Sequence, residues 1–219
     1  MKTYDIDEVR RCYDLAARAY SDKFLGELES KPLDRWLLER FAASLRSGTV
    51  VYDFGCGSGQ TTRFLRSLGL RSILGLDISP ATIALARERN PDLCFEVDDM
   101  LRSRHPDASA EGIVAFYAIV HFGYHEFGVA LSEWHRLLKP GGRLLFSFHA
   151  GRGSLRSRDF LEVKGAVATW RFLDPGKVLG LVRAAGFAIE EALVREPYGG
   201  AEHPSKRCYV LAAKGRIDP

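Results

Sequence analysis

The stretch VVYDFGCGSGQ, residues 50–60, decides the fold. Its apolar start is too short for a helix and is rich in β-branched and aromatic residues, which is typical of a buried parallel strand. In an open α/β sheet, ligands bind beyond the carboxyl ends of such strands. Because Asp53 stands near the end of the expected strand, we expect Gly55, Gly57 and Gly59 to lie in a ligand-binding crevice.

The glycine spacing and the aspartate indicate which ligand the loop accepts. A dinucleotide fingerprint has its third glycine five positions after the first, and here that position holds Gln60. The Asp53 carboxylate would repel a pyrophosphate, which favours the positive end of the following helix. The same carboxylate would attract a ligand that carries positive charge and no phosphate. S-adenosylmethionine, with its ammonium group and sulfonium centre, fits this description.

Two later strand ends carry side chains that suit the rest of this nucleoside. Asp77 ends the second expected strand, 24 positions after Asp53, close to the ~20 positions expected for an acidic residue that holds ribose hydroxyls. The alternative is that Asp77 only partners the start of the helix that follows. Asp99 follows the third expected strand, where a carboxylate could accept a hydrogen bond from an adenine amino group. Met100 could cover the adenine ring with its flexible thioether.

The remaining hydrophobic patterns alternate between short strands and amphipathic helices. This alternation predicts an α/β fold in which a mostly parallel sheet carries helices on both faces. The last two strand patterns follow one another without a helix between them, so one of these strands is expected to run antiparallel. Seven strands are expected, over residues 49–54, 72–78, 93–100, 112–120, 143–150, 187–194 and 207–214.

We expect the chain to form a single domain, residues 1–219. Its N-terminal part is expected to be helical, because apolar residues recur at three- and four-residue spacing from Val9 to Tyr20. The expected parts are a helical N-terminal cover, a cofactor-binding core, a less regular segment on the acceptor side, and a helix with the final strand pair, over residues 1–45, 46–150, 151–175 and 176–219.

Composition and charge are those of an ordinary globular protein. The chain has 219 residues, a net charge of +3 and scattered Lys and Arg, which does not indicate a nucleic-acid surface. Its four cysteines form no CxxC pair, so we expect neither a zinc site nor disulfides. We therefore expect a cytoplasmic setting. The N-terminus lacks the apolar h-region of a signal peptide, and no apolar run approaches the ~20 residues of a membrane span, so we expect neither feature. Histidines and carboxylates do not cluster at ligand spacing, and no metal is expected.

Four sequence motifs resemble those of one enzyme family. VYDFGCGSGQTTRFL, GLDISPATIALARE, FEVDDM and LKPGGRLLFSF follow in order between about residues 50 and 150. They resemble the successive motifs of class I S-adenosylmethionine-dependent methyltransferases. The resemblance implies a Rossmann-like, seven-stranded and mostly parallel sheet with one antiparallel strand near the C-terminus. The N-terminal YDLAARAY is similar to the helix over the cofactor in small-molecule members, in which Tyr13 or Tyr20 would face the site.

The resemblance also assigns roles to residues. It implies that Gly55 and its neighbours line the methionine portion, that Asp77 holds the ribose, and that Asp99 and Met100 hold the adenine. The implied activity is transfer of a methyl group from S-adenosylmethionine to a small-molecule acceptor. The expected cofactor-binding residues are Tyr20, Asp53, Gly55, Cys56, Gly57, Asp77, Ile78, Asp99, Met100 and Tyr117.

The acceptor side holds two candidate catalytic bases. His121 follows the fourth expected strand, and His149 ends the fifth. An imidazole near the sulfonium could take a proton from a hydroxyl, phenol or amine as that group is methylated. The alternative is that each histidine is only a hydrogen-bonded wall residue. Catalysis mainly requires a nucleophile placed in line with the breaking bond, so a base is needed only if the acceptor must lose a proton.

Two other functions stay open from the sequence. A nucleic-acid methyltransferase would share the cofactor motifs, but the fourth expected strand is not followed by an Asn-Pro-Pro-Tyr run and the basic residues are scattered. A protein of the same fold could instead bind the cofactor and methylate nothing. The acceptor, the methylated atom and the oligomeric state do not follow from the sequence.

Overall fold

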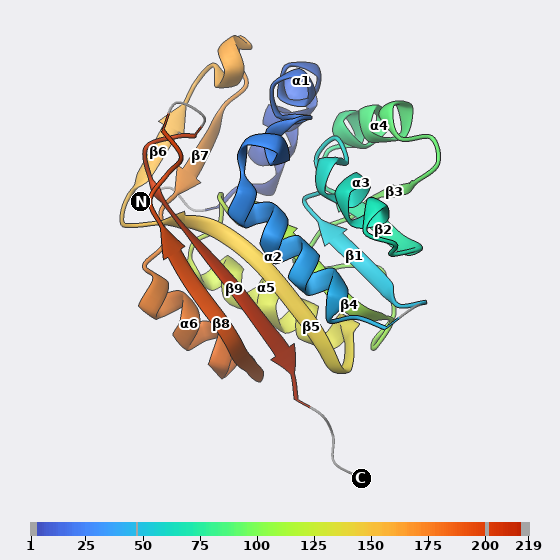
Figure 1. Ribbon diagram of the computed structural model, residues 1–219. Helices are drawn as coiled ribbons and strands as arrows, with labels where there is room; N and C mark the ends of the chain where they lie inside the picture. The colour runs from blue at the N-terminus through green and yellow to red at the C-terminus, as the bar shows by residue number, and fades with distance from the viewer. Residues whose placement is uncertain (1–3, 47, 200–201, 216–219) are drawn as a thin grey trace.

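Seven strands form the central sheet of the computed structural model, which describes residues 4–46, 48–199 and 202–215 (Figure 1). Their order is β3-β2-β1-β4-β5-β9-β8. Strand β9 pairs antiparallel with β5 and β8, and the other pairs are parallel. The predicted α/β fold with one antiparallel strand near the C-terminus is therefore confirmed. The strands are β1 Val50–Phe54, β2 Ser72–Asp77, β3 Cys94–Val97, β4 Ala110–Phe116, β5 Leu138–Ala150, β8 Phe187–Arg195 and β9 Lys206–Lys214.

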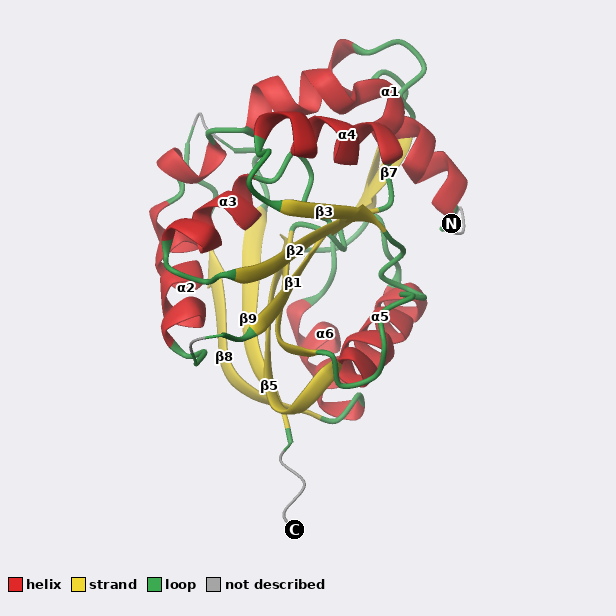
Figure 2. Cartoon of the chain, turned by 90° about the vertical axis from the view of Figure 1, so that its right-hand side faces the viewer, coloured by secondary structure: helices red, strands yellow, loops and turns green. Residues whose placement is uncertain are grey.

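Helices cover both faces of this sheet, with α2 and α3 on one face and α5 and α6 on the other (Figure 2). On the first face, Phe41 of α2 and Leu65 of α3 pack in one buried cluster with Val114 of β4. On the second face, Trp134 of α5 and Val182 of α6 belong to another buried cluster. The helices are α1 Ile6–Phe24, α2 Pro32–Ala43, α3 Gln60–Ser67, α4 Pro80–Arg89, α5 Tyr124–Leu137 and α6 Pro175–Ala184, with short 3-10 helices η1 Glu27–Ser30 and η2 Phe160–Glu162.

Helix starts follow from the local sequence. The Asp5 side chain caps α1 by accepting from two backbone N–H groups of the first turn. The Ser79 side chain caps α4, and Pro80 occupies the first helical position, where it costs no hydrogen bond. Of these two helices, α1 contributes Val9, Tyr13 and Tyr20 to the lining of the site described below. Residues 1–3 of the expected helical cover lie outside the described residues. Among the described residues, no helix has both the length and the apolar character needed to span a bilayer.

The fourth strand ends earlier than predicted. The expected strand ran to residue 120, but β4 stops at Phe116. Tyr117 adopts a left-handed conformation, with φ of 52°, and donates its backbone N–H toward the Ser147 Oγ at 3.0 Å. Because a side chain makes this conformation costly, nothing in the sequence marks Tyr117 as the stop. Residues 117–123 therefore form a loop at the sheet edge rather than the end of a strand.

The segment expected to be less regular contains a β-hairpin. Strands β6 Ser154–Ser157 and β7 Ala168–Arg171 pair antiparallel and form a separate two-stranded sheet. The Arg171 backbone N–H donates to the Val120 carbonyl at 2.7 Å. The hairpin is thereby fixed to the loop that follows β4. Figure 1 shows it rising beside α1, at the edge of the sheet where the parallel strands end.

Candidate functional site

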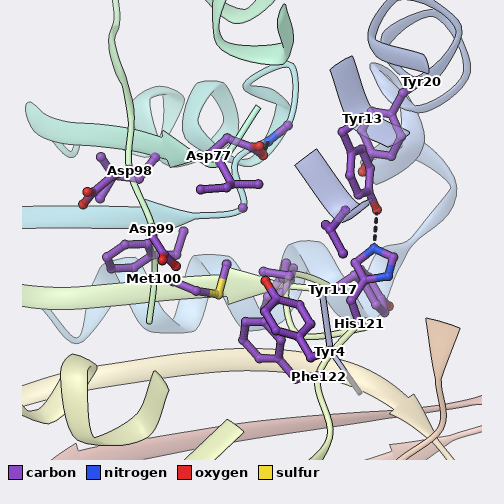
Figure 3. Close-up of a pocket in the computed structure, with 18 residues that line it drawn as sticks. Tyr4, Tyr13, Tyr20, Asp77, Asp98, Asp99, Met100, Tyr117, His121 and Phe122 are labelled. Atoms are coloured by element: carbon purple, nitrogen blue, oxygen red, sulfur yellow. Dashed lines mark hydrogen bonds between the residues drawn. The ribbon is translucent and has the colours of Figure 1, made fainter. Parts of the chain in front are cut away.

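A cavity opens where the carboxyl ends of β1, β2 and β4 meet (Figure 3). Strand β1 pairs in parallel with both β2 and β4, so the three strands end at the same edge of the sheet. The empty space at this site is about 690 Å³, which includes the solvent at its open mouth. It is lined by Tyr4, Val9, Tyr13, Tyr20, Phe54, Gly55, Gly57, Leu76, Asp77, Ile78, Asp98, Asp99, Met100, Phe116, Tyr117, Ala118, His121 and Phe122.

The glycine loop presents bare backbone to this cavity. Gly55 and Gly57 have φ of 68° and 56°, a region that side chains make costly. A Cβ on Gly55 would lie 2.5 Å from the Ala118 Cβ. A Cβ on Gly57 would lie 3.1 Å from the ring of Tyr20, so Tyr20 of α1 covers the loop. The glycines are therefore required for both the turn and the close approach of α1.

Asp77, at the end of β2, is held by backbone donors. The Gly57 N–H donates to its Oδ2 at 3.1 Å, and the Ser79 N–H donates to its Oδ1 at 3.0 Å. Burial raises the pKa of Asp77, while these backbone bonds oppose the rise. Each carboxylate oxygen has more than one acceptor site, so both can accept a further hydrogen bond. The carboxylate is thus fixed in a position from which it can hold two neighbouring hydroxyl groups.

Asp99 and Met100 lie on the other side of the cavity from Tyr13 and His121 (Figure 3). The Leu101 N–H donates to Asp99 Oδ1 at 2.9 Å and fixes the carboxylate in the loop after β3. Burial raises the pKa of Asp99, and the neighbouring Asp98 adds to the rise. Ile78 also lines the cavity. This side therefore combines one carboxylate acceptor with apolar surface.

Two expected cofactor residues do not line the cavity. Asp53 is 1% exposed, and its Oδ2 accepts a hydrogen bond from the Thr62 hydroxyl at 2.6 Å. Burial raises the pKa of Asp53 to about 7, so the carboxyl is partly protonated near neutral pH. Cys56 packs with Ile83 and Phe95 beneath α4. The Asp53 carboxyl therefore does not face the cavity, contrary to the expectation that it attracts the cofactor, and the Cys56 side chain also points away from the cavity.

The charge of the cavity lining still favours a cationic ligand. Within the described residues, the ionisable acids that line it are Asp77, Asp98 and Asp99, and neither Lys nor Arg does. Asp98 is 3.7 Å from the Arg104 guanidinium and accepts from the Ser103 hydroxyl, so it is already paired. The attraction for a cation therefore comes from Asp77 and Asp99, not from Asp53. No group of His, Cys, Asp and Glu in this part of the chain could hold a metal ion.

His121 lies inside the cavity wall with both ring nitrogens engaged. Its Nδ1 is 2.9 Å from the Thr169 carbonyl oxygen of β7, and its Nε2 is 3.0 Å from the Tyr13 hydroxyl of α1 (Figure 3). Burial lowers the pKa of His121 to about 4, and the Arg171 charge adds to the lowering. The imidazole is therefore neutral near neutral pH, the form in which a base can accept a proton.

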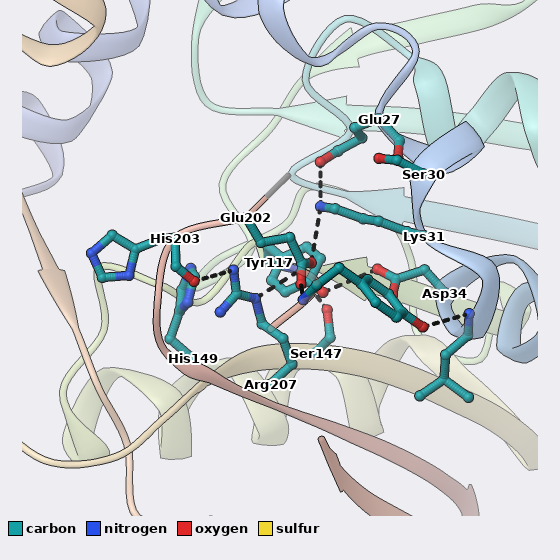
Figure 4. Close-up of polar contacts among 12 residues, drawn as sticks. Glu27, Ser30, Lys31, Asp34, Tyr117, Ser147, His149, Glu202, His203 and Arg207 are labelled. Carbon is teal, nitrogen blue, oxygen red and sulfur yellow. Dashed lines mark hydrogen bonds and ion pairs between the residues drawn. The ribbon is translucent and has the colours of Figure 1, made fainter. Parts of the chain in front are cut away.

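His149, the second candidate base, lies outside the cavity (Figure 4). Its Nδ1 is 2.8 Å from the Ser205 hydroxyl, and its ring lies 5.8 Å from the ring of Tyr117. Burial and the Arg207 charge lower the pKa of His149 to about 3. Tyr117 thus stands between His149 and the cavity, which corrects the expectation that both histidines face the reacting group.

A buried ionic cluster supports Tyr117 from behind (Figure 4). Asp34 of α2 is fully buried and accepts from the Tyr117 hydroxyl at 3.0 Å and the Tyr209 hydroxyl at 2.6 Å. The Arg195 guanidinium donates to the same carboxylate at 3.1 Å. The Lys31 ammonium lies 4.7 Å from the centre of the Tyr117 ring. The left-handed turn at Tyr117 is therefore held by side chains from both ends of the chain.

Helix α1 closes the cavity and is tied to two neighbouring elements, by Glu8 in its first turn and by Asp14 near its middle. Asp14 accepts from the Ser79 hydroxyl at 2.6 Å and ties α1 to the start of α4. Glu8 accepts from the Arg156 guanidinium at 2.7 Å and ties α1 to the hairpin. Tyr4 also lines the cavity and was not among the predicted site residues. Its place one residue before the Asp5 cap is where a hydrophobic side chain commonly fixes the entry of a helix.

Comparisons with known proteins indicate a methyltransferase family. Residues 51–142 match the family model described as a methyltransferase domain. The malonyl-acyl-carrier protein O-methyltransferase of Serratia marcescens is 33% identical over 147 residues, which are 66% of this chain and 50% of that protein. An uncharacterized methyltransferase of Geobacillus is 33% identical over 108 residues, 49% of this chain and 50% of that protein. The chain thus spans about half the length of these relatives.

Solved structures share the fold over most of the chain. An S-adenosylmethionine-dependent methyltransferase from Methanosarcina mazei matches with a TM-score of 0.71 and 20% identity, over 80% of this chain and 96% of that one. The 4+2 cyclase SpnF matches with a TM-score of 0.77 and 17% identity, over 99% of both chains. At these identities the likeness is one of fold, and the fold alone hosts more than one chemistry.

Proposed function

We propose, from the premise that this chain belongs to the class I S-adenosylmethionine-dependent methyltransferase family, that it methylates a small-molecule acceptor. One observation carries the proposal. The cavity at the ends of β1, β2 and β4 joins a bare glycine loop to Asp77, and its charged side chains are all carboxylates. Such a lining suits a cationic nucleoside without phosphate.

The residues present fit this cofactor. Gly55 and Gly57 both line the cavity with φ of 68° and 56°, so the loop presents backbone without side chains to a ligand. We assign the methionine portion to Gly55 and Gly57, the ribose to Asp77, and the adenine to Asp99 and Met100. Two features support the assignment, namely the fixed carboxylate of Asp77 and the lining positions of all five residues. Ile78, Tyr20 and Tyr117 complete the proposed cofactor wall.

S-adenosylmethionine, when bound, supplies a methyl group that is already activated on a sulfonium. The chain then has to hold the acceptor in line with the breaking bond and to exclude water. Helix α1 contributes Tyr13 and Tyr20 to the wall and is tied down at Asp14, which suits it for enclosing the reacting groups. His121 is the proposed base for an acceptor that must lose a proton.

The relatives do not identify the acceptor. The printed name of one is malonyl-acyl-carrier protein O-methyltransferase, and that of another, from Burkholderia cenocepacia, is ribosomal protein L11 methyltransferase. We propose a small acceptor because the cavity is covered by α1 and walled by aromatic rings. A nucleic acid is disfavoured because no Lys or Arg of the described chain lines the cavity. The cytoplasm stays the proposed location, on the cysteine spacing of the sequence alone.

Calorimetry and a transfer assay test this proposal. We expect the purified chain to bind S-adenosylmethionine and not NAD, because the lining carboxylates repel a pyrophosphate. With a panel of small acceptors and radiolabelled cofactor, we expect S-adenosylhomocysteine to form together with a labelled product. Cofactor binding with no product from hydroxyl, amine, thiol and carboxylate acceptors would favour a non-catalytic binding protein. Binding of NAD in place of S-adenosylmethionine would contradict the proposal outright.

A further inference from the structure

We propose that Tyr13 and His121 form a proton relay of fixed direction, and that it serves an acceptor whose methylated atom is a neutral hydroxyl oxygen. The inference rests on the proposed function and deepens it. It adds Tyr13 as a catalytic residue that touches the acceptor, and it names the class of acceptor. The hydrogen bond of 3.0 Å between the Tyr13 hydroxyl and His121 Nε2 is its starting point.

Hydrogen bonding fixes the direction of the relay. A backbone carbonyl only accepts, so the contact of 2.9 Å with the Thr169 oxygen places the hydrogen of neutral His121 on Nδ1. Nε2 then carries a lone pair, and the Tyr13 hydroxyl must donate to it. The Tyr13 oxygen keeps its own lone pairs for a further donor. An acceptor hydroxyl in the cavity can therefore donate to Tyr13 and reach the imidazole only through it.

The reaction balances through this pair. The acceptor oxygen forms a bond to the methyl carbon, while the carbon–sulfur bond breaks and its electron pair stays on sulfur. The acceptor proton passes to the Tyr13 oxygen, and the Tyr13 proton passes to His121 Nε2. The products are a methyl ether, a neutral thioether, unchanged Tyr13 and an imidazolium. The imidazolium later gives its proton to water and returns to the starting form.

Charge conservation makes the relay suitable for a buried site. The sulfonium loses one positive charge as the imidazole gains one, so the net charge inside the cavity does not change. Moving an existing charge costs less in a water-poor cavity than creating a new one. The groups that face the pair are Tyr20 and Asp77 on the side of Tyr13, and Glu8 and Arg171 on the side of His121. With both carboxylates ionised their formal charges sum to −1, so together they favour the imidazolium, although the Arg171 charge alone opposes it.

The surroundings favour a hydroxyl on an apolar body. A neutral amine is nucleophilic enough to attack before it loses a proton, and a carboxylate has no proton to lose, so neither depends on this relay as a neutral hydroxyl does. The nearest cations behind Tyr117 are engaged, since Lys31 is 2.5 Å from Glu27 and Arg207 is 3.7 Å from Glu202. Among the described residues no Lys or Arg lines the cavity, so none is placed there to hold an anionic acceptor.

Aromatic rings surround the Tyr13–His121 pair. The Phe160 ring lies 6.0 Å from that of Tyr13, and the Trp170 ring lies 5.1 Å from that of His121. Phe160 and Trp170 also contact each other at 4.6 Å. These two rings pack behind the pair, outside the cavity lining. The rings that do line the cavity, among them Tyr4, Tyr20 and Phe122, favour an apolar or aromatic body next to the reacting oxygen. A phenol or an alcohol on an apolar frame is the acceptor class that fits.

The tautomer of His121 tests the relay without any acceptor or cofactor. We expect nitrogen-15 NMR of histidine-labelled chain to show a neutral imidazole with its hydrogen on Nδ1, down to about pH 5 because burial lowers the pKa of His121 to about 4. The His121→Asn variant assigns the signal, and His135→Asn, which changes a histidine of α5, is the matched control. A hydrogen on Nε2, or an imidazolium at pH 7, would overturn the relay.

Three matched probes test the acceptor class, namely 2-naphthol, 2-naphthoic acid and 2-(aminomethyl)naphthalene. We expect the chain to methylate naphthol. In Tyr13→Phe we expect kcat to fall roughly 100-fold, which is the rate enhancement that a positioned acid–base group commonly contributes. Cofactor affinity should stay within about twofold, and Tyr198→Phe, on the C-terminal loop, should keep wild-type rates. Three results would overturn the inference. The chain could methylate only the amine or the acid, it could methylate none of the probes, or Tyr13→Phe could methylate naphthol at the wild-type rate. The first of these results would leave the proposed methyltransferase function standing, whereas a failure to bind the cofactor would remove both.

Discussion

Replacing Asp77 by alanine is expected to weaken S-adenosylmethionine binding by roughly 100- to 1,000-fold while the chain stays folded. A hydrogen bond to a charged group contributes about 1.5–3 kcal/mol, and the carboxylate is placed to accept two of them from the ribose. Each ~1.4 kcal/mol changes affinity tenfold. The substitution also removes the acceptor for the Gly57 N–H, which loosens the glycine loop. Isothermal titration calorimetry measures the change.

Two controls make this result specific. Asp92→Ala removes a carboxylate whose side chain is 55% exposed and paired with Arg63, so cofactor affinity should not change. Circular dichroism should show native secondary structure in Asp77→Ala. The ribose assignment would be wrong if the variant kept wild-type affinity. It would also be wrong if Asp92→Ala lost as much affinity as Asp77→Ala.

The second large effect is expected on stability, from Asp34→Ala. Asp34 is fully buried and accepts from two tyrosine hydroxyls and from Arg195. Removing one partner of a buried ionic cluster leaves the others unpaired, and such losses cost about 3–5 kcal/mol. We expect about 3 kcal/mol here, because Arg195 keeps a contact of 2.6 Å with Glu202. Urea unfolding, followed by circular dichroism, measures the free energy of unfolding.

An exposed carboxylate provides the matched control for this measurement. Asp7 pairs with Arg10 on the surface of α1, with side chains 56% and 47% exposed, so Asp7→Ala should change the free energy of unfolding by less than about 1 kcal/mol. Asp34→Asn keeps the shape and part of the hydrogen bonding, so its loss should fall between the two. A loss below about 1 kcal/mol in Asp34→Ala would show that the cluster behind Tyr117 adds little to stability.

The parts of the site that could be predicted are those set by strand order and chain direction. Gly55 and Asp77 end neighbouring parallel strands, so their closeness follows from the sheet alone. The hydrophobic pattern places each strand of the central sheet within a few residues. The antiparallel β9 follows because a short turn cannot return a chain for parallel pairing.

The expected site residues that lie outside the cavity are those whose position depends on the direction in which a side chain points. Strand β1 is buried on both faces, so its pattern does not tell that Asp53 faces Thr62 of α3 instead of the cavity. The turn at Tyr117 is a non-glycine residue in a left-handed conformation, for which the sequence carries no signal. That turn puts Tyr117 between the cavity and His149. Long-range packing, not local propensity, decided these positions.

The β6–β7 hairpin escaped prediction for a similar reason. Each strand has four residues, and the segment is rich in Gly, Arg and Ser, so no alternating pattern is long enough to indicate a strand. The pairing is stabilised by contacts made only in the folded chain, such as that between Arg156 and Glu8 of α1. The Thr169 carbonyl, which orients His121, therefore could not be found from sequence.

A crystal structure of the chain with S-adenosylhomocysteine tests the central claim most directly. The claim is that the carboxylates at the ends of parallel strands, with the bare loop beside them, select a phosphate-free nucleoside. We expect the two ribose hydroxyls within hydrogen-bond distance of the Asp77 carboxylate, and the sulfur on the side of the cavity that holds Tyr13 and His121. Density for the ligand elsewhere, with the cavity beside Gly57 left empty or filled by a pyrophosphate compound, would contradict it.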